Sequence, residues 1–137
     1  MSAVPEAVPT RRGPLVVVGG VLAAVVLSSL VNAVLAVAAL AAGAPDDFQP
    51  LKPSSYIFLT ALGLAGGAVG WAVVRQVSAR PAALVRWLAP TLVVVSFIPD
   101  FLLFEAGGAA GVIALLAMHV AVGVIAVATY RKVMPLA

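Results

Sequence analysis

Hydrophobic residues gather in four long runs along this chain and do not alternate with polar ones. The runs cover about residues 15–42, 56–74, 84–104 and 111–130, and charged residues, prolines or glycines bound them. A helix needs about 20 apolar residues to cross a bilayer, and each run is close to that length or longer. Because the runs are apolar on every side, their length and flanking charges favour spanning helices over buried strands. The pattern predicts an all-α integral membrane protein folded as an antiparallel four-helix bundle.

The four runs leave too little chain for a separate soluble domain. We expect one four-span transmembrane domain over residues 15–132, a disordered cytoplasmic tail over 1–14 and a short cytoplasmic tail over 133–137. An alternative for the first run is a signal peptide, since an arginine pair precedes it and small residues follow it. The apolar part of a signal peptide usually has about 7–15 residues, so the longer run favours a retained span.

Composition narrows the class of protein further. Hydrophobic residues make up 64% of the 137 residues and charged residues only 9%, whereas soluble domains are about one-quarter charged. The chain has no cysteine, which excludes disulfides, thiolate metal sites and iron–sulfur clusters. The net charge is +3, but the basic residues are scattered over termini and loops, so we expect no nucleic-acid partner.

The charged residues also predict an orientation in the membrane. Seven of the eight basic residues fall on one side of the four spans, namely Arg11, Arg12, Arg75, Arg80, Arg86, Arg131 and Lys132. The opposite side receives Asp46, Asp47, Lys52 and Glu105. The positive-inside rule then places both termini in the cytoplasm. Trp71, Trp87 and Tyr130 are expected near the inner interface as part of an aromatic belt.

Each run carries one polar residue in its outer half, and these four form a candidate polar pocket: Asn32, Thr60, Asp100 and His119. His119 is the only histidine, and an ionisable residue inside the membrane is a functional candidate. Asp100 and His119 differ in depth by about 10 Å on straight helices, so direct contact requires a kink, a long reach or a bridging water. The alternative is structural, because polar side chains between membrane helices often only bond to one another, contributing about 0.6 kcal/mol on average.

A second feature is a set of glycines in the second run: Gly63, Gly66, Gly67 and Gly70. They form two overlapping GxxxG pairs, a spacing that lets another backbone approach closely. The face predicts either a contact with another helix of the same bundle or a seam between two copies.

No cofactor or metal is predicted from these residues. A haem site would need His119 to face its twin in a symmetric dimer or to pair with Met118. A metal site built from Asp100, Glu105 and His119 lacks ligand pairs at helical spacing. No nucleophile has a neighbouring base, so an enzyme acting on lipid with His119 as base is the least favoured alternative.

Several stretches together resemble a known family. These are FQPL before the second run, ARP before the third, SFIPD ending at Asp100, and the MH pair at Met118 and His119. They resemble an uncharacterised family of small bacterial four-transmembrane-helix proteins, a domain of unknown function, over most of the chain. The resemblance implies a multi-pass protein of the bacterial cytoplasmic (inner) membrane and singles out Asp100 and His119. It implies no activity, ligand or cofactor.

These observations favour a non-enzymatic scaffold or accessory subunit. Its partners would be the lipid bilayer and either another copy, giving a homo-oligomer, or a larger membrane complex. The alternative function is a transporter or binder of a small molecule, a lipid or protons, using a polar outer-half pocket around His119 and Asp100. The prolines of the third run have no counterparts in the other runs, and this lack of internal repetition weighs against a transporter.

Overall fold

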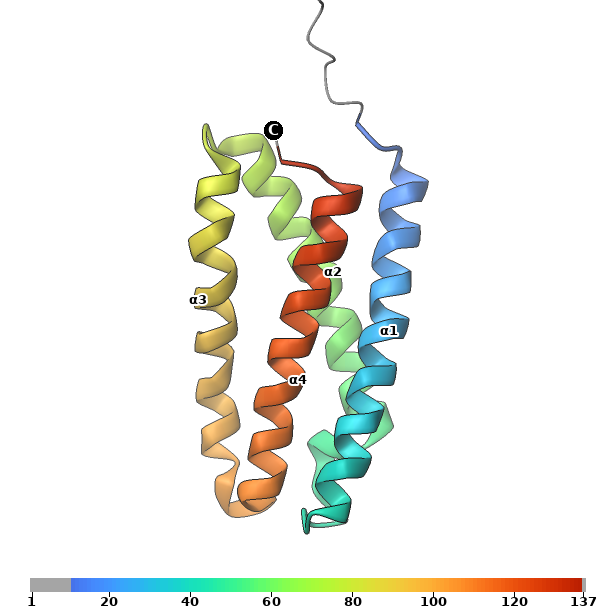
Figure 1. Ribbon diagram of the computed structural model, residues 1–137, viewed down its shortest axis with the longest axis vertical. Helices are drawn as coiled ribbons and strands as arrows, with labels where there is room; N and C mark the ends of the chain where they lie inside the picture. Colours follow the sequence, from blue (N-terminus) through green and yellow to red (C-terminus); the bar gives the residue numbers. More distant parts are fainter. Residues whose placement is uncertain (1–10, 137) are drawn as a thin grey trace, which may run out of the picture.

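The computed structural model describes residues 11–136, and these form four long α-helices. They are α1 (Pro14–Ala41), α2 (Pro53–Val77), α3 (Pro81–Leu102) and α4 (Phe104–Val133), with a short 3-10 helix, η1 (Gln49–Leu51), before α2. Consecutive helices run in opposite directions (Figure 1). All four are long and apolar enough to cross a membrane. The predicted all-α bundle of four membrane-length helices is therefore confirmed.

The helices extend a few residues beyond most of the hydrophobic runs. Three of them begin on a proline, namely Pro14, Pro53 and Pro81, which suits the first helical position because the missing N–H has no partner there. Helix α2 extends three residues beyond each end of residues 56–74, and α4 extends three residues beyond residue 130. Residues 104–110, at the start of α4, include the break in helical geometry at Gly108. The expected tail over 1–14 falls largely on residues 1–10, which lie outside the described part of the chain.

The expected C-terminal tail is instead partly packed against the bundle. Val133 still belongs to α4, and Met134 is buried. The indole N–H of Trp71 donates to the carbonyl of Met134 at 2.9 Å, and Tyr130 packs beside the Trp71 ring with centroids 5.4 Å apart. Trp71 and Tyr130 are thus buried in the core, whereas Trp87, the third residue expected near the inner interface, is 72% exposed.

Helix α4 is the centre of the bundle and contacts each of the other three helices. Three glycines bring the backbones together: Gly20 of α1 faces Val133, Gly67 of α2 faces Tyr130, and Gly123 of α4 faces Val93 of α3. A Cβ added at any of them would lie 2.6–2.8 Å from the facing side chain. The missing side chains are therefore what allows α4 to approach its neighbours.

The buried core consists of two apolar clusters separated by polar residues. One cluster contains Ala36, Ala39, Ala44, Phe48, Leu51, Tyr56, Ala114, Leu115 and Met118. The other contains Ala24, Leu64, Trp71, Val85, Tyr130, Val133 and Met134. Ser28, Asn32 and Thr60 are also buried, and on both α1 and α2 they fall between the two clusters in sequence. They form a polar layer across the middle of the α1–α2 hairpin.

The connection between α1 and α2 is fastened to α4 by one aromatic ring. Phe48 is 5% exposed, and its ring lies against Gly107 and Gly111. A Cβ added at Gly107 would lie 2.5–2.8 Å from three ring carbons. The two glycines thus form the seat for Phe48, and its ring packs the loop against α4.

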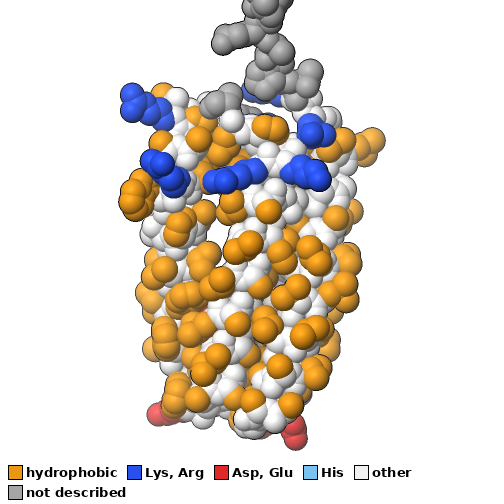
Figure 2. All heavy atoms as spheres, viewed as in Figure 1, with side chains coloured by type: hydrophobic (Ala, Val, Ile, Leu, Met, Phe, Trp, Pro, Cys, Tyr) orange, Lys and Arg blue, Asp and Glu red, His pale blue; other side chains and the backbone are white. Residues whose placement is uncertain are grey.

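Charged side chains separate to the two ends of the bundle. On the face shown in Figure 2, Lys and Arg gather at the end where α1 begins and α4 ends, and Asp and Glu lie at the opposite end. Hydrophobic side chains cover the length between them. The surface therefore has an apolar belt bounded by one cationic end and one acidic end.

Candidate functional site

The four candidate polar residues form two separate pairs in the structure. The side-chain amide of Asn32 on α1 donates to the hydroxyl of Thr60 on α2 at 3.0 Å. On the other hairpin, Nδ1 of His119 on α4 lies 2.6 Å from Oδ2 of Asp100 on α3. Each helical hairpin therefore has its own polar pair between its two helices.

Asp100 and His119 meet because the chain reverses at Gly108, six residues after the end of α3 at Leu102. Backbone bonds from Leu103 and Gly107 continue the turn past α3, and the helical geometry breaks only at Gly108, where φ is 63° and ψ is −174°. A residue with a side chain rarely adopts this conformation. Counted from Gly108, the two residues differ in depth by about 5 Å on straight helices, in place of the expected 10 Å. The remaining distance is within the reach of the two side chains.

The two partners of this pair differ in exposure. The Asp100 side chain is 7% exposed, whereas that of His119 is 39% exposed. Nδ1 of His119 also lies 3.0 Å from the carbonyl of Leu115, and the ring of Phe97 is edge-on at 6.4 Å. A carbonyl can only accept a hydrogen bond, so the contact requires that Nδ1 carry a hydrogen. Asp100 Oδ2 has the close contact to Nδ1 but no well-aligned hydrogen bond, and the hydrogen bond of Nδ1 goes to the Leu115 carbonyl.

The two pairs lie at a similar depth. Gly20 faces Val133 across the antiparallel α1–α4 contact, and this register sets Asn32 opposite position 121 of α4, two residues from His119. The rise of a helix makes that difference about 3 Å. The pairs therefore occupy one level of the bundle, in two different helix–helix contacts.

The four residues line neither of two hollows on the described surface. One hollow runs along α3 beside Arg86 and Trp87, and the other lies between α1 and α4 near Gly20 and Lys132. The arrangement therefore consists of two buried polar pairs, with His119 partly accessible from outside the bundle.

Sequence reasoning missed Ser28, although it lies four residues before Asn32 and so on the same face of α1. Ser28 is fully buried and Asn32 is 2% exposed. Within the described residues, the Ser28 hydroxyl and Oδ1 of Asn32 have no hydrogen-bond partner. The i, i+4 spacing of the two polar side chains was the available signal.

The glycines of α2 face outward more than inward. Gly67 packs against Tyr130, but a Cβ at Gly63, Gly66 or Gly70 would meet nothing within 4 Å. All four glycines are exposed in the single chain. A contact within the bundle therefore accounts for Gly67 and not for the other three.

Side chains that bind metals are sparse in this region. Among the described residues, no group of three or more His, Cys, Asp or Glu side chains lies close enough to hold a metal ion. Glu105 lies in the first turn of α4, on the far side of the break at Gly108 from His119.

Comparison with known proteins agrees with the four-helix architecture. The model of a family of unknown function, DUF6069, matches residues 10–135. Comparisons with curated proteins and with solved structures found no match. The family match spans all four membrane-length helices and includes both polar pairs, and the chain therefore belongs to DUF6069.

Proposed function

We propose that this protein is a non-enzymatic subunit of the bacterial cytoplasmic membrane that assembles with a second copy of itself through α2. The observation that carries the proposal is the outward stripe of Gly63, Gly66 and Gly70, beside which there is open space. Leu59 and Val73 extend the stripe, are exposed, and share its face at the i, i+3 and i+4 spacing. A small-residue face of this kind suits close packing of two membrane helices.

The polar pairs support a structural role inside each copy. The described partners of His119 are a carboxylate, a backbone carbonyl and a phenyl ring, and none of these is a nucleophile that a base could activate. Asn32 and Thr60 bond to each other. Each pair lies between the two helices of its own hairpin, and neither occupies the outer face of α2, which stays available for assembly.

Disulfide cross-linking in native membranes tests the assembly, since the chain has no cysteine of its own. Leu59→Cys and Val73→Cys should each give a covalent dimer on oxidation, because their side chains flank the glycine stripe. Ala65→Cys is the matched control: it is exposed on the same helix but about 100° from Gly66. Adding Gly66→Leu should abolish the cross-link by holding the helices apart.

A monomer in every variant would overturn self-assembly, and so would equal cross-linking at Ala65. A product of mass other than twice 13.8 kDa would show that α2 packs against a different membrane protein.

We propose that the cationic end of the bundle lies in the cytoplasm, because positively charged residues favour that side of the membrane. In intact cells, a membrane-impermeant maleimide should label Ser54→Cys, which is exposed at the start of α2. It should label Ala79→Cys, exposed in the link between α2 and α3, only after the cells are opened. The reverse pattern would place both termini outside.

A second candidate function is a binder or transporter of a small molecule, a lipid or protons, and one observation favours it. His119 combines a buried carboxylate partner with a 39% exposed side chain, so its ring can reach a molecule outside the bundle. Native mass spectrometry of protein extracted in its own lipids separates the two functions. A bound species that disappears in both His119→Ala and Asp100→Ala would favour the binder, and unchanged ligand content would favour the subunit.

A further inference from the structure

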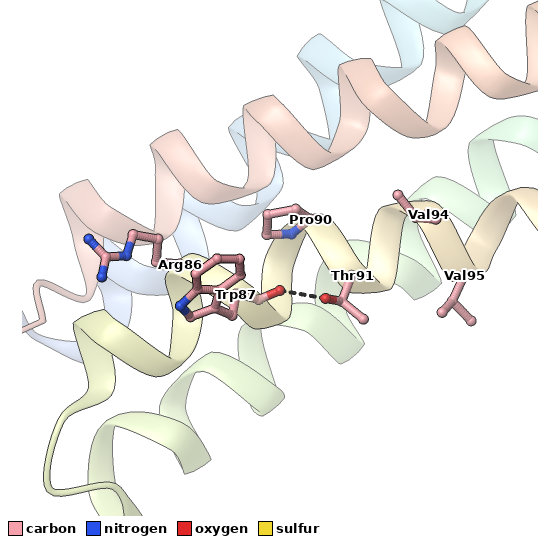
Figure 3. A pocket seen from close by; sticks show the side chains of 6 residues that line it. All are labelled: Arg86, Trp87, Pro90, Thr91, Val94 and Val95. Carbon is pink, nitrogen blue, oxygen red and sulfur yellow. Dashed lines mark hydrogen bonds between the residues drawn. The ribbon is translucent and has the colours of Figure 1, made fainter.

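A groove runs along α3 on the outside of the bundle, away from both polar pairs. Its lining comes from a single helix face and consists of Arg86, Trp87, Pro90, Thr91, Val94 and Val95. Figure 3 shows Arg86 and Trp87 at one end, Val94 and Val95 at the other, and Pro90 with Thr91 between them. The groove is therefore cationic and aromatic at one end and apolar at the other.

The middle of the groove offers few free polar groups. Pro90 has no amide N–H, so the carbonyl of Arg86, four residues earlier and toward the cationic end of the groove, has no helical donor. The Thr91 hydroxyl donates to the carbonyl of Trp87 at 2.7 Å, which keeps the hydroxyl occupied within the helix. The proline ring and the threonine methyl group are what remains for an occupant, and both suit a hydrocarbon chain.

The length of the groove matches one leaflet of a bilayer. Val95 lies nine positions after Arg86, which corresponds to about 14 Å along a helix. Half of the hydrocarbon core of a bilayer is about 15 Å. Arg86 lies five residues into α3 (Pro81–Leu102), at the end of the bundle where the basic residues gather. The groove thus extends from headgroup level to about the middle of the membrane.

The charge of the groove is uncompensated by the described residues. Arg86 is exposed, and no described carboxylate forms an ion pair with it; the one close contact of this kind joins His119 and Asp100. Trp87 is 72% exposed beside it, where an indole ring suits the headgroup region. A guanidinium binds phosphate oxygens in paired, charge-assisted hydrogen bonds.

We infer that this groove binds one anionic phospholipid from the leaflet at the cationic end of the protein. The guanidinium of Arg86 holds the phosphate, Trp87 borders the headgroup, and one acyl chain lies over Pro90, Val94 and Val95. The inference concerns α3 and does not depend on assembly through α2.

Tryptophan fluorescence tests this in the full chain reconstituted into vesicles. The chain has two tryptophans; Trp71 is 6% exposed and Trp87 is 72% exposed, so lipids with brominated chains quench mainly Trp87. A Trp87→Phe variant measures the background from Trp71. In vesicles of brominated phosphatidylcholine, unbrominated phosphatidylglycerol should relieve the quenching more than unbrominated phosphatidylcholine does. We expect a relative affinity of about fivefold for the anionic lipid, the effect of one basic residue at a membrane surface.

Arg86→Gln should reduce that preference to about onefold, and Arg86→Lys should retain part of it. Arg80→Gln removes the same charge from an exposed position just before α3 and should leave the preference intact. Equal relief by the two lipids in the unchanged chain would overturn the inference. An equal loss in Arg80→Gln and Arg86→Gln would also overturn it, because the preference would then come from general surface charge.

Discussion

Phe48→Ala is expected to lower the free energy of unfolding by about 3–5 kcal/mol, the usual cost of removing a buried phenyl ring. The ring is 5% exposed and belongs to the core cluster that contains Ala114, Leu115 and Met118. The space left by the ring cannot be filled easily, because Gly107 and Gly111 have no side chains to move into it and both belong to α4. Reversible unfolding in mixed micelles would measure the loss.

The seat itself provides the check on this interpretation. Gly107→Ala should also be destabilising, because its Cβ would lie 2.5–2.8 Å from ring carbons of Phe48. Once Phe48 is alanine, Gly107→Ala should cost much less, so the two changes should be non-additive. Phe58→Ala is the matched control: Phe58 is 64% exposed on α2, and its loss should cost about 0.5 kcal/mol or less. A loss at Phe58 as large as that at Phe48 would contradict the role of the seat.

His119→Leu should lower the free energy of unfolding by about 3–5 kcal/mol, because it removes one partner of a buried polar pair and strands the other. The carboxyl of Asp100 is buried, and Nδ1 of His119 at 2.6 Å is its closest described partner. Asp100→Leu combined with His119→Leu should recover most of the loss, since replacing both members with apolar side chains is often neutral or stabilising. The same unfolding measurement applies. A double variant as unstable as His119→Leu would contradict this explanation, because the loss of stability would then not come from an Asp100 carboxyl left without its partner.

The four helices could be predicted from sequence because the information is local. A run of apolar residues long enough to cross a bilayer has few other ways to satisfy its backbone. The helix ends could not be predicted from hydropathy, since α2 and the C-terminal end of α4 continue through polar residues beyond the apolar runs. The packed C-terminal residues were missed for another reason: Met134 accepts a bond from Trp71, which is 63 residues earlier in the chain.

The polar residues could be selected from sequence, but their pairing could not. Asp100 and His119 meet because the chain reverses at Gly108. This residue lies in the gap between the third and fourth apolar runs, but hydropathy does not fix which residue of the gap makes the turn. The adjacent Gly107 and Gly108 were a turn signal at that point.

For the glycines of α2, the sequence predicts a type of contact but not the partner. Their spacing indicates a face that another helix can approach closely. The residues near them in the sequence do not determine whether that helix belongs to the same copy or to a second one.

The polar layer of Asn32 and Thr60 has a consequence for how the protein enters the membrane. If α1 slipped past α2 by one turn, the amide would move about 5.4 Å from the hydroxyl and would lie among apolar side chains without a partner, which is costly. The Asp100–His119 contact restricts α3 and α4 in the same way. Each hairpin thus carries its own means of alignment, and the first can settle in the bilayer before the ribosome has completed the second.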